Sequence, residues 1–187
     1  WGVVPASENA RTAKTTNAQS VHIATAGMNF TPAEVSVDLL SSISAVSAGT
    51  MHTCALTKDE DAKCWGNNWM GALGDGTRVT RLTPVFVQMQ KGSVASIEAG
   101  SDFSCLLTSG GGVKCWGYNT WGKTGNGTSI GYQSTPGDVM GLASGVRAIS
   151  TGENHACALM DMGGVKCWGM NIHGQLGDGT SVDKSTP

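Results

Sequence analysis

The chain is built from one segment that occurs three times. The pattern Ala-Gly-x-x-His-x-Cys-Ala-Leu returns with small variations, and each copy is followed by Lys-Cys-Trp-Gly. The tryptophans of this second motif are Trp65, Trp116 and Trp168, so the period is 51 residues and then 52. A fixed period of this length is typical of arrays in which each repeat is one supersecondary unit. The repeat therefore constrains the fold more than any other feature of the chain.

Each repeat continues with a second set of shared residues. An Asn and a Gly follow Trp-Gly, then comes Gly-Asp-Gly-Thr or Gly-Asn-Gly-Thr, and Thr-Pro closes the unit. Glycines on both sides of Asp or Asn indicate a tight turn, because glycine adopts positive φ without steric cost. The shared positions are Asn68, Asn119 and Asn171; Gly71, Gly122 and Gly174; Asp75, Asn126 and Asp178; and Pro84, Pro136 and Pro187.

The apolar pattern within one repeat predicts short strands. Residues 94–97 alternate, residues 104–108 are mainly apolar, and residues 113–116 follow a Ser-Gly-Gly-Gly turn. Strands of this length cannot bury both faces within one unit, so neighbouring units must stack face to face. Radial stacking achieves this and leaves only short sheet edges. The sequence therefore predicts an all-β fold, a β-propeller of about 51-residue repeats.

These motifs at this period resemble the repeats of the regulator-of-chromosome-condensation family. The resemblance rests on A-G-x-x-H-x-C-A-L, K-C-W-G-x-N, G-x-L-G-D-G-T and T-P, and it covers residues 43–187. It implies a seven-bladed ring, which needs more repeats than a chain of 187 residues holds. We therefore expect an incomplete set of blades that belongs to a longer chain, with a ring assembled from several chains as the alternative.

The repeat boundaries divide the chain into four parts. Residues 1–42 are interpreted as the tail of a divergent repeat, in which an Ala/Thr/Asn/Ser-rich loop insertion replaces the Gly-Asp-Gly-Thr turn. Residues 43–93 and 94–145 are each expected to form one repeat. Residues 146–187 are expected to form a repeat that is truncated at its end.

The six cysteines form three pairs whose members are ten residues apart. If the segment between them is a hairpin turn, the two members lie opposite each other on antiparallel strands, with Cα atoms about 4.5–5.5 Å apart, and a disulfide can join them. We predict three disulfides within blades and an oxidising compartment. Free buried thiols and metal ligation are the alternatives. The pairs are Cys54 and Cys64, Cys105 and Cys115, and Cys157 and Cys167.

Charge is sparse along the whole chain. Only 14% of residues are Asp, Glu, Lys or Arg, and the net charge is −2. This balance provides no electrostatic attraction to nucleic acid or to an acidic membrane surface. No segment approaches the roughly 20 apolar residues of a membrane span. We therefore expect no nucleic-acid partner and no membrane insertion, and the cysteine pairs favour an extracellular or cell-surface location.

Positions that differ between the copies are those that the shared packing does not dictate. The family resemblance implies that the loops after the repeated Gly lie on a propeller face that docks partners. Tryptophans that do not recur are contact candidates, because Trp is enriched among interface hot spots, and packing within the fold is the alternative for both of them. The candidate partner-binding residues are Met51, Trp69, Asp102, Trp121, Asn154 and His173.

Other conspicuous residues are interpreted as structural. Trp65, Trp116 and Trp168 recur at one position and are expected to pack between blades. His52 has Phe103 at the equivalent position of the next repeat, so this position accepts an aromatic side chain without ionisable chemistry. No nucleophile, base and acid stand at a motif spacing. We therefore identify no catalytic residue, no metal site and no cofactor.

The acidic turn of two repeats has two interpretations. Asp75 and Asp178 could belong to a calcium loop, but each turn offers one carboxylate, whereas calcium takes six to eight oxygen ligands. The middle repeat has Asn126 in the same place. A tight turn accounts for the motif, and a calcium loop is the alternative.

The leading functional hypothesis is a non-enzymatic secreted or cell-surface recognition scaffold that binds a protein or glycan through variable propeller loops. Resemblance to the family's namesake gives one alternative, guanine-nucleotide exchange or other regulation of a small GTPase, which predicts reduced cysteines and an intracellular location. A second alternative is a propeller-type inhibitor of a secreted enzyme, as in the bacterial family members that bind β-lactamases. An enzyme would need clustered acids, a metal set or an activated nucleophile, and the sequence shows none of these.

Overall fold

The computed structural model describes residues 43–187 and contains eleven β-strands. The interpretation of residues 1–42 as a divergent repeat lies outside the described residues. A single short 3-10 helix, η2 (Thr120–Gly122), is the one helical element of the described part. The strands are β1 (Ile43–Ala48), β2 (His52–Thr57), β3 (Ala62–Gly66), β4 (Arg81–Phe86), β5 (Val94–Ala99), β6 (Phe103–Thr108), β7 (Val113–Tyr118), β8 (Tyr132–Asp138), β9 (Val146–Thr151), β10 (His155–Met160) and β11 (Val165–Gly169).

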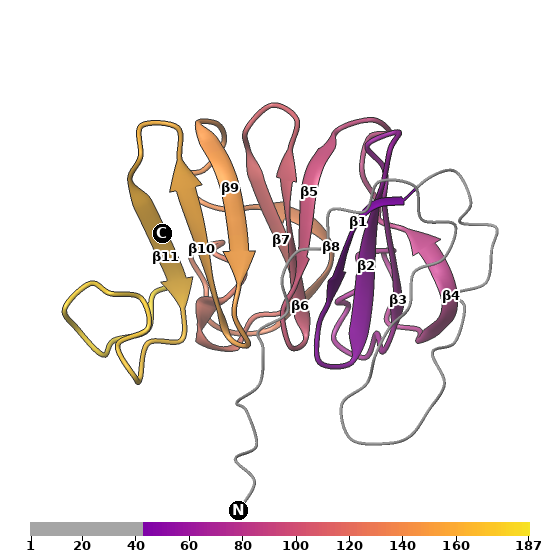
Figure 1. Cartoon of the computed structure of the whole chain (residues 1–187). Coiled ribbons are helices and arrows are strands. Elements are labelled where there is room, and N and C mark those ends of the chain that lie inside the picture. Colours follow the sequence, from indigo (N-terminus) through magenta and orange to yellow (C-terminus); the bar gives the residue numbers. More distant parts are fainter. Residues whose placement is uncertain (1–42) are drawn as a thin grey trace, which may run out of the picture.

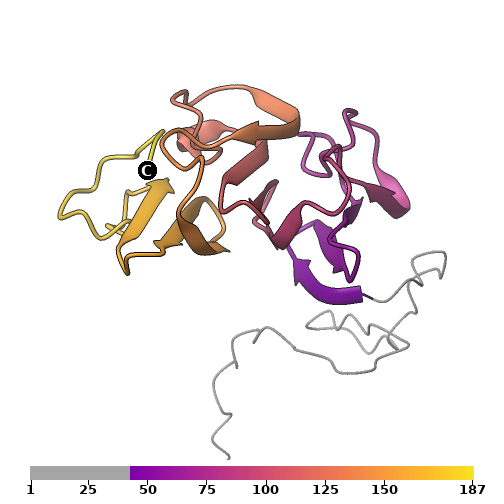
Figure 2. The same cartoon turned by 90° about the horizontal axis from the view of Figure 1, so that it is seen from above.

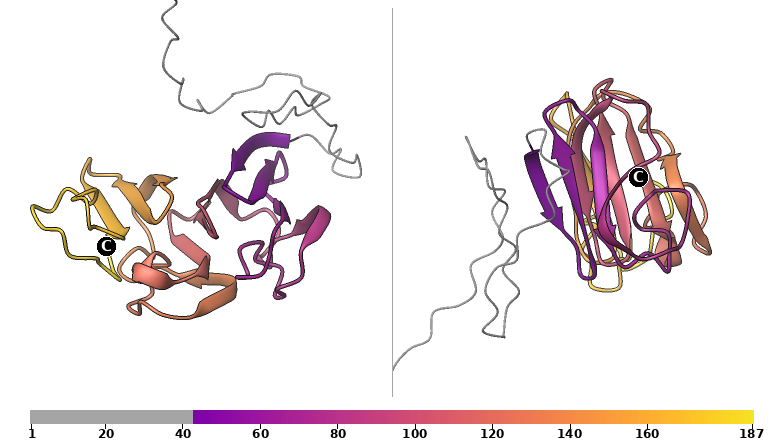
Figure 3. Two further views of the ribbon diagram at one scale, coloured as in Figure 1. Left: turned by 90° about the horizontal axis from the view of Figure 1, so that it is seen from below. Right: turned by 90° about the vertical axis from the view of Figure 1, so that its right-hand side faces the viewer.

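The strands form three antiparallel sheets, and each sheet is one blade. The first blade has the order β1-β2-β3-β4, the second β5-β6-β7-β8, and the third β9-β10-β11. The blades stand side by side (Figure 1), and seen along the strands they follow an arc (Figures 2 and 3). The first strands of successive blades, β1, β5 and β9, contact one another at the inner side of the arc. The predicted all-β propeller architecture is confirmed.

The sequence analysis missed the outer strands β4 and β8. It placed Thr-Pro at the close of a unit, whereas Pro84 and Pro136 lie inside these two strands. Proline has no N–H for a sheet ladder, so it is tolerated only at a sheet edge or a bulge. Both strands pair on one side only, and their pairing to β3 and β7 contains register shifts. Irregular pairing of this kind leaves no clean alternation of apolar residues for a sequence pattern to reveal.

A tryptophan from each following blade closes the contact to the blade before it. Trp116 of β7 and Trp168 of β11 are fully buried. The indole N–H of Trp116 donates to Ala72 O at 2.8 Å, and that of Trp168 donates to Lys123 O at 3.0 Å. The predicted packing of these two tryptophans between blades is confirmed. Trp65, on the first described blade, is half-buried.

Each indole requires a glycine in the turn that it meets. Gly74 has a φ of 69°, and a Cβ atom at this position would lie 2.7 Å from Trp116 Nε1. Gly125 has a φ of 68°, and its Cβ would lie 2.9 Å from Trp168 Nε1. The first glycine of Gly-Asp-Gly-Thr therefore supplies both the left-handed backbone and the space for the next blade.

The apolar core lies between the blades. One buried cluster joins Cys54 and Leu73 of the first blade to Val94, Ile97 and Trp116 of the second. A second cluster joins the second blade to the third in the same way. Because each blade supplies only one wall of a core, the blades stabilise one another as a stacked set.

The two described blade contacts differ at one buried pair. In the first contact, His52 Nε2 lies 2.8 Å from Ser104 Oγ, and Ser104 Oγ donates to Ala72 O at 2.8 Å. The single hydroxyl proton is used in the second bond, so His52 donates its Nε2–H to Ser104 Oγ. In the second contact, Phe103 and Ala156 occupy the equivalent positions in a buried apolar cluster. A polar pair and an apolar pair thus fill the same place in successive contacts.

Burial lowers the pKa of His52 from 6.5 to about 4, although the negative charge of Asp102 acts in the opposite direction. As the pH falls, the unfolded chain therefore binds a proton at this histidine before the folded chain does. The stability that neutral His52 provides is complete above about pH 6.5, and it is lost as the pH falls toward 4.

We predict that the apolar pair can replace the polar pair. His52→Phe combined with Ser104→Ala should abolish a loss of about 2 kcal/mol in unfolding free energy between about pH 7 and pH 5, measured by urea titration. Ser104→Ala alone retains His52 and should retain the pH dependence. Burial also lowers the pKa of His155, which stays in every variant and leaves a residual slope. A double variant with the full original slope would contradict the assignment.

All six cysteines are paired as predicted. Each pair lies directly across β2–β3, β6–β7 or β10–β11, and the Cα atoms of each pair are 4.1 Å apart. This distance is characteristic of a closely spaced, non-hydrogen-bonded pair of residues on antiparallel strands. Each disulfide therefore joins the two central strands of a blade.

Candidate functional site

All six candidate partner-binding residues lie at one end of the blades. The strands of a blade alternate in direction, so the loops after its first and third strands emerge together, at the bottom of Figure 1. We call this end the loop face. It comprises residues 49–51, 67–80, 100–102, 119–131, 152–154 and 170–183. The six candidates on it are Met51, Trp69, Asp102, Trp121, Asn154 and His173.

Backbone hydrogen bonds join the inner loops of this face. Thr50 N donates to Gly100 O at 3.3 Å, and one blade further on Ser101 N donates to Glu153 O at 3.2 Å. The loops that follow β1, β5 and β9 are thereby tied into a continuous inner rim. Met51 stands on this rim with 60% of its surface exposed.

A buried asparagine organises each outer loop. The Asn68 side chain donates to Val79 O at 3.2 Å and accepts a hydrogen bond from Leu73 N at 3.0 Å. Asn171 is also buried and makes the corresponding bonds, to Val182 O and from Leu176 N. The buried Asn119 accepts from Thr124 N and donates to Thr128 O. Paired polar groups of this kind can be buried without a large energetic penalty. The repeated Asn therefore fixes the backbone of the loop and leaves the side chains between its contacts free to vary.

The aspartate of the turn is engaged in hydrogen bonds. Asp75 accepts bonds from Thr77 N at 2.9 Å, from Thr77 Oγ1 at 2.7 Å and from Arg81 Nε at 2.9 Å. Burial acts to raise the pKa of Asp75, but these bonds outweigh it and hold the pKa below its ordinary value. At Asp178 the hydrogen bonds from Thr180 lower the pKa to about 2. The tight-turn interpretation of the motif is confirmed.

Three of the six candidates meet at Lys123, a residue that the sequence analysis did not select. The side chain of Lys123 is 1% exposed, and its ammonium group forms a salt bridge with Asp102. The same group donates to Asn154 Oδ1 at 3.1 Å, so it joins the inner loops of the second and third blades. The third candidate, Trp121, precedes it by two residues.

Aromatic rings enclose the Lys123 ammonium group. Its nitrogen lies 5.1 Å from the ring centroid of Tyr118, 5.5 Å from that of Phe103 and 5.6 Å from that of Trp121. Cation–π attraction at these distances compensates in part for the loss of water around the charge. Trp121 has a φ of 65°, which is uncommon for a residue with a side chain, and it remains 37% exposed. The cluster thus holds an exposed indole in a fixed place on the loop face.

The other three candidates stand apart from this cluster. Trp69 is 70% exposed at the beginning of the outer loop of the first blade. His173 is exposed on the outer loop of the third blade, where its backbone N–H donates to Gln175 Oε1 at 2.9 Å. The structure therefore places the candidates on one face but not in one pocket.

The sequence held a weak signal for Lys123. Its equivalents are Ala72 and Gln175, so the position varies, and it lies beside Tyr118 and Trp121, which are found in one repeat only. Variation at a single site within a motif could have marked it as a position of special function. Its burial between two blades could not be inferred from one repeat.

We predict that Lys123 is a main support of the loop face. Lys123→Ala should lower the unfolding free energy by about 3 kcal/mol, because it removes a buried cation and leaves Asp102 without its partner. Chemical denaturation measures this loss. The control is Lys184→Ala, because Lys184 forms a partly exposed salt bridge with Asp178 at 3.4 Å, and its loss should lower the unfolding free energy much less than Lys123→Ala does. Equal effects of the two substitutions would contradict the role of Lys123.

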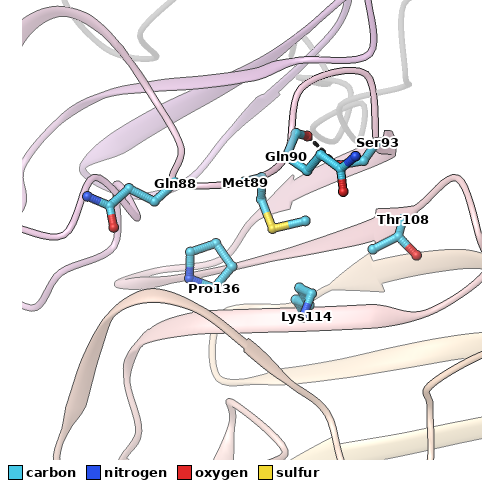
Figure 4. A pocket seen from close by; sticks show the side chains of 7 residues that line it. All are labelled: Gln88, Met89, Gln90, Ser93, Thr108, Lys114 and Pro136. Atoms are coloured by element: carbon cyan, nitrogen blue, oxygen red, sulfur yellow. Dashed lines mark hydrogen bonds between the residues drawn. The ribbon is translucent and has the colours of Figure 1, made fainter.

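A separate groove lies between the β4–β5 connection and the second blade, and none of the six candidates lines it. Its volume is about 750 Å³, and it is open to solvent (Figure 4). The residues that line the groove are Gln88, Met89, Gln90, Ser93, Thr108, Lys114 and Pro136.

Within residues 43–187, no group of three His, Cys, Asp or Glu side chains is placed to hold a metal ion. The same residues include no helix long and apolar enough to cross a membrane.

The repeats match two models of the "Regulator of chromosome condensation (RCC1) repeat". One model matches residues 43–71, 94–127 and 146–175, and the other matches residues 64–107. These segments together cover more than half of the chain.

Known proteins of several kinds are similar in sequence to this chain. The chain is 37% identical to human E3 ubiquitin-protein ligase HERC2 over 139 residues, which are 73% of this chain and 3% of that protein. It is 33% identical to the ultraviolet-B receptor UVR8 of Arabidopsis thaliana over 145 residues, which are 76% of this chain and 33% of that protein. The chain thus spans a third or less of these two relatives.

Solved structures share the fold. Human WBSCR16 matches with a TM-score of 0.73 and 26% identity, over 83% of this chain and 42% of that one. Yeast RCC1 (Prp20), crystallised with Kap60, matches with a TM-score of 0.66 and 22% identity, over 78% of this chain and 36% of that one.

Proposed function

Because this chain belongs to the regulator of chromosome condensation (RCC1) repeat family, we propose that it is a non-enzymatic recognition scaffold that binds a partner protein through the loop face. This proposal rests mainly on the positions at which the repeats differ from one another. The shared residues, such as Trp116, Gly74 and Asn68, build the blades and their contacts. Among the residues that are not shared, Trp69 and Trp121 are exposed on the loop face.

The composition of this face favours a protein as the partner. Exposed Trp and Met side chains on a rigid support provide apolar contact area with little loss of conformational entropy on binding. The yeast relative has been studied for its binding to Gsp1p and histones and was crystallised with Kap60. Those partners belong to that protein, and we propose for this chain only the general mode, the docking of a protein on a propeller.

We further propose that the protein acts outside the cell or at its surface. Every cysteine is engaged in a disulfide, and disulfides persist in oxidising compartments but are rare in the cytosol and nucleus. Regulation of a small GTPase inside the cell is the alternative function, and it requires the same cysteines to be reduced.

A pair of surface variants tests the loop face. We expect the Trp69→Ala, Trp121→Ala double variant to bind the partner isolated from the native source at least about 10-fold more weakly than the unmodified protein. The control is Met162→Ala with Val165→Ala, which removes two exposed side chains at the β10–β11 turn, at the opposite end of the blades. It should bind with unchanged affinity, measured by surface plasmon resonance.

Two results would oppose this proposal. If both double variants bind equally well, the loop face is not the interaction surface. If enzymatic removal of glycans from the partner abolishes binding, the ligand is a glycan and not a protein surface. Circular dichroism of each variant confirms that the blades are folded before affinities are compared.

The oxidation state in native material tests the proposed compartment. We expect iodoacetamide to label the six cysteines of protein from its native source only after reduction, as measured by intact mass. Samples must be trapped in acid so that thiols do not oxidise during isolation. Six labelled cysteines without reduction would overturn the extracellular assignment and favour the intracellular regulator.

A further inference from the structure

Exposed apolar side chains gather where the outer loop of the first blade meets the outer strand of the second. Trp69 is 70% exposed, Val79 58%, Ile130 82% and Tyr132 52%. Large apolar side chains that lie exposed in one region of a soluble protein mark sites of interaction. We call this region the junction patch and define it by Trp69, Met70, Arg78, Val79, Ile130 and Tyr132.

Backbone contacts hold the two sides of the junction patch together. Gly76 N donates to Ser134 O at 2.9 Å, which joins the loop of the first blade to β8. At Gly71, with a φ of 82°, a Cβ atom would lie 2.8 Å from Ser134 Cα, so the two backbones touch. Asn68 fixes the loop from beneath through its bond to Val79 O. The patch therefore lies on backbone that needs no rearrangement to present it.

One cation stands within this apolar region. The Arg78 guanidinium carbon lies 4.3 Å from the ring centroid of Tyr132, so the group lies against the aromatic ring and spans the two blades. Arg78 forms no salt bridge within residues 43–187, because the nearby Asp75 is paired with Arg81. A guanidinium stacked on a ring through its face keeps its N–H edge available for a carboxylate.

We propose that the junction patch docks a protein segment in which a large apolar side chain lies next to an Asp or Glu. The apolar side chain would contact the Trp69 side of the patch, and the carboxylate would pair with Arg78. This inference rests on the proposed function and deepens it, since it names the chemistry of the partner and adds Arg78 and Tyr132 to the sequence candidate Trp69. A neutral polar ligand such as a sugar would leave the cation without a counter-charge.

Selection from a random peptide library displayed on phage tests the proposal. Peptides selected on the unmodified protein should be enriched in an acidic residue beside a Leu, Phe, Trp or Met. Binding of a selected peptide should weaken about 10-fold or more in Arg78→Gln, and similarly in Trp69→Ala. Arg147→Gln removes another exposed arginine, on β9, and should leave binding unchanged.

A double-mutant cycle identifies the charge pair directly. Replacement of the peptide's acid by its amide should weaken binding to the unmodified protein by about the same factor as Arg78→Gln, and should cause little further loss in that variant. Additive losses would overturn the pairing. Failure to select any peptide, or selection without acidic enrichment, would overturn the patch as a whole.

The two proposals fail in different ways. If the native partner still binds and depends on the loop face while the peptides do not meet these expectations, the junction patch is wrong and the recognition function stands. If the native partner also binds independently of the loop face, the function itself is wrong.

Discussion

The hydrogen bond from a buried indole N–H to a backbone carbonyl of the preceding blade is the interaction on which the rest of this structure depends. Trp116 and Trp168 each fill the space over a glycine and satisfy their polar group in the same contact. Without this contact, the large apolar surface of the indole would be exposed to water and the carbonyl would lack a hydrogen-bond partner. Both would raise the free energy of the folded state. The core clusters form around these contacts, so no blade has a complete core of its own.

The acceptor in this contact is a main-chain oxygen, and this has a consequence for function. Ala72 and Lys123 present the same carbonyl although their side chains differ completely. The position is therefore fixed in its backbone and free in its side chain. In the second blade this position is Lys123, whose buried ammonium group lies between two inner loops and binds Asp102 and Asn154.

The loops of the proposed binding face are stabilised in the same way. The side chains of Asn68, Asn119 and Asn171 form hydrogen bonds with backbone groups on the inner side of each loop. The loop conformation therefore does not depend on the residues at the surface. Substitutions at the loop surface should therefore change the free energy of unfolding little. This accounts for the contrast between the shared interior of the repeats and the differences at Trp69, Trp121 and His173.

The sequence by itself determined the repeat, the all-β class, the propeller stacking and the cysteine pairs, because each is a periodic or local property that one chain displays in several copies. The paired cysteines at a spacing of ten, for example, lie opposite each other in a hairpin whose turn is centred between them. Only the tertiary structure decided what happens between copies. The hydrogen bond between His52 and Ser104, the hydrogen bond of Lys123 to Asn154 and the contact of Arg78 with Tyr132 each join residues 31 to 54 positions apart, across contacts between blades that no single repeat contains. The sequence also did not predict the outer strands β4 and β8. Each contains a proline and pairs with a shifted register, so its position depends on the neighbouring strand and not on an apolar pattern of its own.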